Sequence, residues 1–205
     1  MYHGERFNSI SHLFGAIAGF IGLVVLVFLA SQKGDIWKIV SFSIYGSTLF
    51  LLYVASTLYH SLRGKAKEFF QQADYYAIYL LIAGSYTPFT LVSLNGPWGW
   101  SLFGAIWLLA LFGIIQESIM RKGRSYFSVF IYAVMGWLNL IALTPLIKAL
   151  TLSGFYMLIL GGLFYTGGVI FYAYDEKIRH FHGIWHLFVL AGSVTHYLTI
   201  FHFVL

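Results

Sequence analysis

The sequence predicts an all-α membrane protein: a bundle of seven transmembrane helices with its N-terminus in the cytoplasm and its C-terminus outside. Of 205 residues, 60% are hydrophobic and only 9% are charged, and the mean hydropathy is +0.80. This composition is typical of multi-span membrane proteins and argues against a soluble domain. Because no long polar segment interrupts the chain, we expect residues 1–205 to form a single transmembrane domain.

Seven apolar segments reach the length of roughly 20 residues that a helix needs to cross a bilayer. They cover residues 9–30, 39–60, 74–93, 99–119, 127–148, 154–174 and 182–204. The connections are short, so consecutive helices are expected to be antiparallel neighbours. Pro88 is expected to kink the third segment, and Gly15 and Gly19 to let the first helix approach another closely. Residues 1–8 lack the basic start of a cleavable signal, so the first segment is expected to remain as a span.

The distribution of basic residues predicts the orientation, because cytoplasmic loops of membrane proteins carry an excess of Lys and Arg. Three basic residues fall on one side of the predicted membrane, at Lys33, Lys38 and Lys148. Nine fall on the other, at Arg6, Arg63, Lys65, Lys67, Arg121, Lys122, Arg124, Lys177 and Arg179. The side with nine holds the N-terminus, which is therefore expected to be cytoplasmic.

The chemistry open to the chain is bounded by its lack of cysteine. Disulfides and thiolate metal ligands are excluded. A transition metal would be held by imidazole, carboxylate or water, a ligand set that favours zinc. The net charge of +5 does not indicate binding to nucleic acid, because topology and lipid headgroups account for the basic loops.

Four ionisable residues lie at or near the ends of three predicted spans: His60, Asp74, His182 and His186. The predicted topology places all four at the cytoplasmic face. Ionisable residues are costly at the edge of a span, so their convergence indicates a functional site. His182 and His186 are one helical turn apart and share a face. With His60 from another helix, they predict a three-histidine metal site with an open position.

Zinc at such a site would bind water and lower its pKa to about 7. Asp74 is the candidate base that takes the proton. Ser56, one turn before His60, is the candidate hydrogen-bond partner of that water or of a substrate carbonyl. Simpler interpretations stay open: the histidine pair would face headgroups, Asp74 would cap its helix, and His60 would lie at the interface beside Arg63.

Further polar residues are expected to have structural roles. Glu5, Asn8 and His12 form one helical stripe, and hydrogen bonding to the bundle or to Arg6 is favoured over catalysis. His196 lies ten residues after His186, about 15 Å deeper at about 1.5 Å per residue, so it is expected to bond Ser193, a tyrosine or water. The turn at residues 175–176, an Asp and a Glu, is expected to be solvated.

The polar motifs resemble those of the hemolysin III family, the bacterial branch of the progestin and adipoQ receptor superfamily. They are Glu5-x-x-Asn8-x-x-x-His12, Ser56-x-x-x-His60, Asp74, and His182-x-x-x-His186 followed by His196. The resemblance covers essentially the whole chain. It implies a seven-helix bundle in the bacterial plasma membrane, with zinc near the cytoplasmic leaflet held by His60, His182 and His186. It also implies that Ser56 and Asp74 complete the site through water. Related membrane enzymes hydrolyse ceramide amides, so hydrolysis of lipid amides is the implied chemistry.

Three functions follow from these patterns. The first is a zinc-dependent hydrolase of lipid amide or ester bonds, with Asp74 as general base, Ser56 at the oxyanion and an acyl chain inside the bundle. The second is a cytolysin, as the family name says, although most spans lack the polar stripe that a water-filled pore needs. The third is a non-enzymatic membrane sensor in which structural zinc tethers the second, third and seventh spans.

Overall fold

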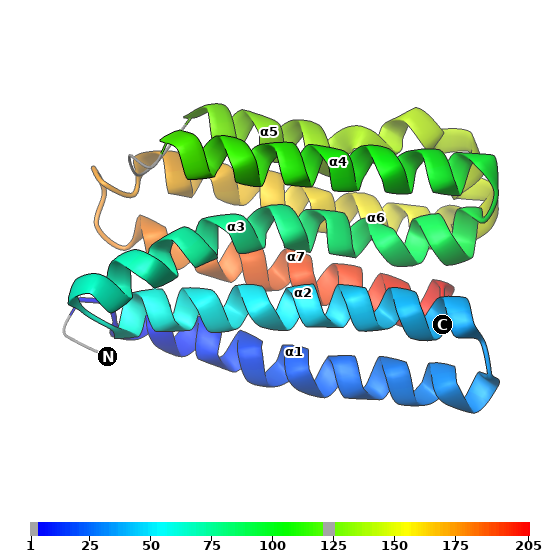
Figure 1. The fold of residues 1–205 in the computed structure, drawn as a ribbon, viewed down its shortest axis with the longest axis horizontal. Coiled ribbons are helices and arrows are strands. Elements are labelled where there is room, and N and C mark those ends of the chain that lie inside the picture. The colour runs from blue at the N-terminus through cyan, green and yellow to red at the C-terminus, as the bar shows by residue number, and fades with distance from the viewer. Residues whose placement is uncertain (1–3, 121–125) are drawn as a thin grey trace.

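A computed structural model describes residues 4–120 and 126–205, and within these two ranges the chain forms only helices and short connections (Figure 1). The elements are α1 (Arg6–Lys33), α2 (Ile36–Ser61), α3 (Gly64–Pro88), η1 (Phe89–Leu94), α4 (Pro97–Met120), α5 (Tyr126–Trp137), η2 (Leu138–Ala142), α6 (Leu143–Tyr174) and α7 (Phe181–Phe203). Six helical stretches of the described chain are long and apolar enough to cross a membrane. The prediction of an all-helical, multi-pass membrane protein is confirmed.

The longest apolar stretch, Tyr126–Tyr174, reverses direction inside its length. Its 49 residues would reach about 70 Å as one straight helix, more than twice the roughly 30 Å core of a bilayer. Thr151 interrupts the helix with φ 63° and ψ 167°. Trp137 on α5 then donates a hydrogen bond of 3.0 Å to Thr166 on α6, which requires the two helices to lie side by side (Figure 1). Thr151 lies in the predicted connection between residues 148 and 154.

Helix α3 begins ten residues earlier than predicted, at Gly64 rather than at Asp74. The polar stretch that separates the two predicted spans is therefore helical instead of a loop. At the other end of α3 the α-helix ends at Pro88 and continues as a π-helix over Phe89–Leu94. The kink expected at Pro88 stays a prediction.

The connection between α1 and α2 is made by two residues with well-defined roles. Gly34 ends α1 in the left-handed conformation, with φ 66°, that favours glycine. Asp35 caps α2 by accepting hydrogen bonds from the backbone nitrogens of Trp37 and Lys38, at 3.0 and 3.2 Å. This tight turn makes α1 and α2 antiparallel neighbours, as predicted.

Close packing joins α1 to its neighbours at the predicted glycine positions. A Cβ atom at Gly15 would lie 2.7 Å from the ring of Tyr53 on α2 and 2.9 Å from Leu190 on α7. Gly19 faces Leu49 on α2 at ordinary contact distance. The absence of a side chain at Gly15 therefore lets three helices meet near the functional site.

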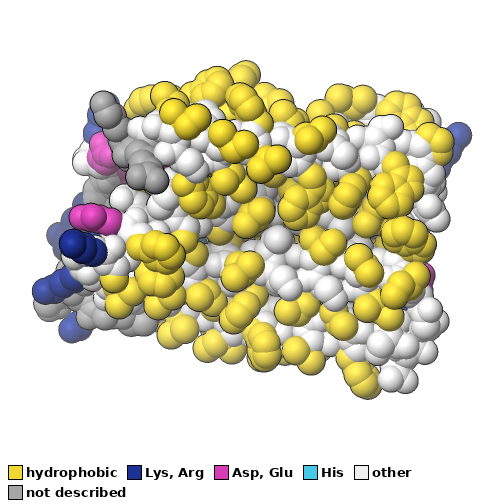
Figure 2. Space-filling view, in the orientation of Figure 1, with side chains coloured by type: hydrophobic (Ala, Val, Ile, Leu, Met, Phe, Trp, Pro, Cys, Tyr) yellow, Lys and Arg dark blue, Asp and Glu magenta, His cyan; other side chains and the backbone are white. Residues whose placement is uncertain are grey.

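The outer surface matches a lipid environment. Large hydrophobic side chains are exposed along α1, α4, α5 and α6, and Figure 2 shows hydrophobic side chains spread over the face of the bundle in view. Lys and Arg side chains gather mainly at the end of the bundle that holds the N-terminus (Figures 1 and 2). The two termini lie at opposite ends (Figure 1). Three of the residues counted for orientation, Arg121, Lys122 and Arg124, lie outside the described residues.

Candidate metal centre

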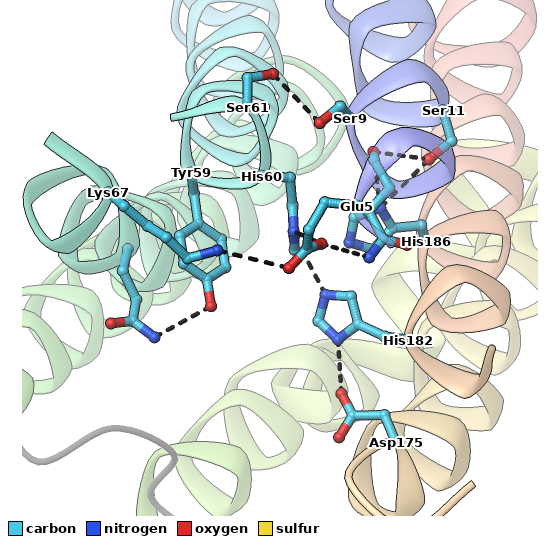
Figure 3. A network of polar contacts seen from close by, with 12 residues as sticks. Glu5, Ser9, Ser11, Tyr59, His60, Ser61, Lys67, Asp175, His182 and His186 are labelled. Carbon is cyan, nitrogen blue, oxygen red and sulfur yellow. Dashed lines mark hydrogen bonds and ion pairs between the residues drawn. The ribbon is translucent and has the colours of Figure 1, made fainter. Parts of the chain in front are cut away.

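Three histidines from two helices meet at the end of the bundle that holds the N-terminus (Figure 3). His60 lies in the last turn of α2, and His182 and His186 lie in the first two turns of α7. One ring nitrogen from each lies within 4.8 Å of the others, close enough to hold a metal ion. His60 and His186 are 2% and 1% exposed, so the interface position considered for His60 is wrong.

Each of the three imidazoles is oriented by an oxygen acceptor at its Nδ1 atom (Figure 3). His60 Nδ1 lies 2.7 Å from the Glu5 carboxylate, and His182 Nδ1 lies 2.6 Å from Asp175. His186 Nδ1 lies 3.3 Å from both the backbone carbonyl of Asn8 and the hydroxyl of Ser11. Ionised carboxylates only accept hydrogen bonds, so the Nδ1 atoms of His60 and His182 carry a proton, and in the neutral rings their Nε2 atoms keep a lone pair.

The resulting arrangement fits a cation. The Nε2 atoms of His60 and His182 are only 3.2 Å apart. Two facing lone pairs repel each other unless a proton or a metal ion lies between them. Neutral imidazoles held by carboxylates at the second nitrogen are the usual surroundings of a histidine-bound metal. The donor set of three imidazoles suits zinc.

Glu5 connects the centre to the polar rim of the bundle. Its carboxylate also accepts a hydrogen bond of 2.8 Å from the Asn8 side chain and lies 3.5 Å from Lys67 Nζ. The hydrogen bond from His60, with help from Asn8 and Lys67, lowers the pKa of Glu5 to about 2 despite its partial burial. Glu5 is therefore an anion that orients His60.

A family model described as "Haemolysin-III related" matches residues 1–197. The chain belongs to this family. It is 44% identical over 202 residues to Hemolysin-3 of Bacillus cereus, covering 98% of this chain and 92% of that protein. It is 45% identical over 190 residues to a Hemolysin-3 homolog of Bacillus subtilis, covering 92% of this chain and 89% of that protein. Monocyte to macrophage differentiation factor of Homo sapiens is 30% identical over 199 residues, covering 94% and 81%. The resemblance to the wider superfamily is thereby confirmed.

Ser56 and Asp74 line the same cavity as the three histidines of this haemolysin-III family member. The cavity has a volume of about 440 Å³. Ser56 lies on α2 one turn before His60 and is buried, and Asp74 lies on α3 within hydrogen-bonding reach of Ser56. Because α3 begins at Gly64, Asp74 is well inside the helix, and the alternative that it caps a helix is wrong.

Asp175 belongs to the site, although it was predicted to lie in a solvated turn. The expected solvated turn exists at Glu176, which is exposed, but the Asp175 side chain is only 5% exposed and binds His182. The chain turns between α6 and α7, and this brings Asp175 back against the first turn of α7. The one signal in the sequence is a carboxylate seven residues before a candidate metal ligand. This spacing alone does not predict a contact, because the path of the turn between the two residues decides whether they meet.

The predicted stripe of Glu5, Asn8 and His12 faces the metal centre. Glu5 and Asn8 do bond α1 to the bundle, as expected, but through the cluster histidines themselves. His12 is 3% exposed and stacks on His186 with a ring distance of 3.6 Å and an interplanar angle of 12°. Its other neighbour is Tyr53, at 5.0 Å. The stripe therefore fixes the position of His186 as well as that of α1.

A second, largely apolar cavity of about 400 Å³ adjoins the first. The two share lining residues from α2, α3, α6 and α7, namely Leu52, Ile78, Tyr172, Trp185 and Val189. His196 lines this second cavity, bonds the backbone carbonyl of Leu158 at 3.2 Å and contacts the ring of Tyr165. It is thus separate from the histidine cluster, as its predicted depth requires, although its hydrogen-bond partner is not one of those expected.

Proposed function

We propose that this haemolysin-III family member is a zinc-dependent hydrolase of lipid amide or ester bonds. One observation carries the proposal: a histidine cluster that could hold a metal ion, a carboxyl group and a hydroxyl group line one cavity, and that cavity shares a wall with an apolar cavity. A hydrolase for lipids needs both parts, one for the reacting bond and one for the hydrocarbon chain.

The polar cavity holds the groups that hydrolysis requires. Zinc held by His60, His182 and His186 would polarise the substrate carbonyl and lower the pKa of a coordinated water to about 7. Asp74 would accept a proton from the water that attacks the carbonyl carbon, and would return it to the leaving amine or alcohol as the carbon–nitrogen or carbon–oxygen bond breaks. Ser56 donates a hydrogen bond to the carbonyl oxygen as negative charge develops there.

The apolar cavity supports membrane lipids as the substrates. Two of its polar side chains are turned toward protein partners: the hydroxyl of Ser85 bonds the carbonyl of Ile82 at 2.8 Å, and that of Tyr165 bonds Ser193 at 2.8 Å. The wall is mostly hydrocarbon and aromatic surface. An acyl chain fits such a wall, whereas a sugar or a nucleotide would lose its hydrogen bonds to water.

The proposal includes seven spans with the N-terminus in the cytoplasm. The reversal at Thr151 supports the division of Tyr126–Tyr174 into two spans, and the nine-to-three distribution of basic residues supports the orientation. The metal centre would then lie at the cytoplasmic end of the bundle.

A second candidate is lysis of membranes, supported by the name Hemolysin-3 of the Bacillus cereus relative. A pore needs polar groups along its lumen. The second cavity is instead lined mostly by apolar and aromatic residues, which favours the hydrolase. Hydrolysis of membrane lipids would also weaken a bilayer, so leakage from liposomes that lack a cleavable lipid would distinguish a pore from an enzyme.

The substitution Asp74→Asn tests the mechanism. We expect the variant to retain metal, measured by elemental mass spectrometry, and to lose about a hundredfold or more of its turnover on lipid amides or esters, because amide cannot replace the base. Glu68→Gln is the matched control, since Glu68 is an exposed carboxylate on the same helix.

Unchanged turnover in Asp74→Asn would reject the mechanism. A wild-type protein that binds zinc but cleaves no lipid amide or ester would reject the enzyme and leave a structural role for the metal. His182→Ala combined with His186→Ala should abolish both metal binding and turnover.

A further inference from the structure

The end of the apolar cavity that is farthest from the metal centre is lined by residues on α3, α5 and α6, among them Tyr86, Trp137 and Gly162. Trp137 ends α5, and its indole nitrogen donates a hydrogen bond of 3.0 Å to Thr166 on α6. Gly162, one turn before Thr166, faces the same indole: a Cβ atom there would lie 3.6–3.9 Å from ring atoms of Trp137. The ring therefore lies over the glycine and closes the gap between α5 and α6.

Tyr86 holds this closure in place from α3. Its hydroxyl donates to the backbone carbonyls of Met135 and Gly136, at 2.7 and 3.1 Å, and accepts from the backbone nitrogen of Asn139 at 2.9 Å. These three bonds satisfy backbone groups where α5 gives way to η2. Tyr86 thus holds in place the backbone on either side of Trp137, at this end of the cavity.

The distance from the metal centre to this closure corresponds to one acyl chain. Asp175, which contacts His182, lies thirteen residues after Gly162 at the end of α6, about 20 Å away at about 1.5 Å per residue. On α7, fourteen residues separate His182 from His196, a distance of about 21 Å. An extended hexadecanoyl chain has about this length.

We propose that Trp137 and Gly162 set the longest acyl chain that the site accepts. The inference rests on the proposed function only in placing the polar end of the lipid at the metal centre. A chain that extends from there along α6 meets the Trp137 ring after about 20 Å. Each methylene that is buried on the apolar wall strengthens binding by roughly fourfold, from about 0.8 kcal/mol, and methylenes beyond the ring gain nothing.

Two substitutions should move this limit in opposite directions. Gly162→Leu adds a bulky side chain where a Cβ atom would already contact the indole, so it narrows this end of the cavity. It should weaken binding of hexadecanoate by at least about tenfold while leaving dodecanoate within about threefold, since only the last few methylenes lose their contacts. Trp137→Ala opens the end and should make eicosanoate bind better than hexadecanoate. Gly162→Ala is the matched control, because its Cβ would make only ordinary contacts.

The measurement is equilibrium binding of radiolabelled dodecanoate, hexadecanoate and eicosanoate to the purified, zinc-loaded protein in detergent, with thermal unfolding of each variant recorded alongside. Identical chain-length profiles in wild type, Trp137→Ala and Gly162→Leu would overturn the proposal, as would a wild type that binds none of the three. If Gly162→Leu does not fold, the shift in Trp137→Ala alone decides. A shifted profile in a protein without hydrolytic activity would reject the proposed function and keep the chain-length limit.

Discussion

Two carboxylates, Glu5 and Asp175, each accept a hydrogen bond from a histidine of the metal cluster. The bonds are 2.7 Å to His60 and 2.6 Å to His182. At both positions the proton is fixed on Nδ1, so the Nε2 lone pair is directed toward the centre of the cluster. The two carboxylates come from opposite ends of the chain, one before α1 and the other after α6. The two carboxylates therefore hold both rings, before a metal binds, in the orientation and the tautomer that metal binding requires.

Replacing Asp175 with Ala should lower the affinity for zinc by about ten- to a hundredfold, because His182 loses the acceptor that orients it. Competition with a chelating dye measures the affinity directly, whether or not the protein is an enzyme. Glu176→Ala is the matched control, since this neighbouring carboxylate is exposed. Equal affinities in the two variants would contradict the orienting role of Asp175.

At the scale of single elements, α5 differs from the other spans. It ends as an α-helix at Trp137 and passes through the short 3₁₀ segment Leu138–Ala142 before α6 begins. The break occurs inside the apolar stretch Tyr126–Tyr174, and unpaired backbone groups would be costly there in a membrane. Tyr86 compensates by bonding two carbonyls and one amide of the junction. A side chain on α3 thus makes an irregular backbone possible on α5.

Removing the Tyr86 hydroxyl with Tyr86→Phe should reduce the free energy of unfolding by about 1–3 kcal/mol, because buried backbone groups lose their partner. Thermal unfolding in detergent measures the change. Tyr156→Phe on α6 serves as the control: Tyr156 is 62% exposed, and a change within about 0.5 kcal/mol is expected there. A loss of the same size in both variants would show that Tyr86 does not support the junction.

At the scale of the whole molecule, charge is concentrated at one end of an apolar bundle. Lys and Arg side chains lie mainly at the end that holds the N-terminus and the metal centre, and hydrophobic side chains cover the sides (Figure 2). Moving these basic groups across a bilayer is costly, so this end is expected to remain in the cytoplasm. The site would then be open to cytoplasmic water and to lipids of the inner leaflet.

Because the chain has no cysteine, single cysteines can report the orientation. In spheroplasts, a membrane-impermeant maleimide should label Gln32→Cys, in the last turn of α1, without permeabilisation. It should label Lys65→Cys, at the start of α3, only after permeabilisation. Both residues are exposed, so accessibility within the protein does not differ. The reverse pattern would show that the N-terminus is outside.

The sequence by itself determined the features that depend on local spacing and composition. Length and hydropathy of the apolar segments predicted a multi-pass helical protein, and the spacing of His182 and His186 placed both rings on one face of a helix. The predicted topology placed His60 at the same face, because short connections make consecutive helices antiparallel. The end of the second span and the start of the seventh therefore lie on one side of the membrane. These predictions needed no contact between distant residues, only the periodicity of a helix and the thickness of a bilayer.

Only the tertiary structure decided how the site is completed. Asp175 reaches His182 because the chain turns back between α6 and α7, and Glu5 reaches His60 because α1 packs against α2. The same is true of the cavity end, where Trp137 and Gly162 meet after the reversal at Thr151. The spacing of these residues along the sequence does not follow the period of a helix, so the sequence pattern does not predict their contacts. They depend on turn geometry and on helix packing, which local composition leaves open.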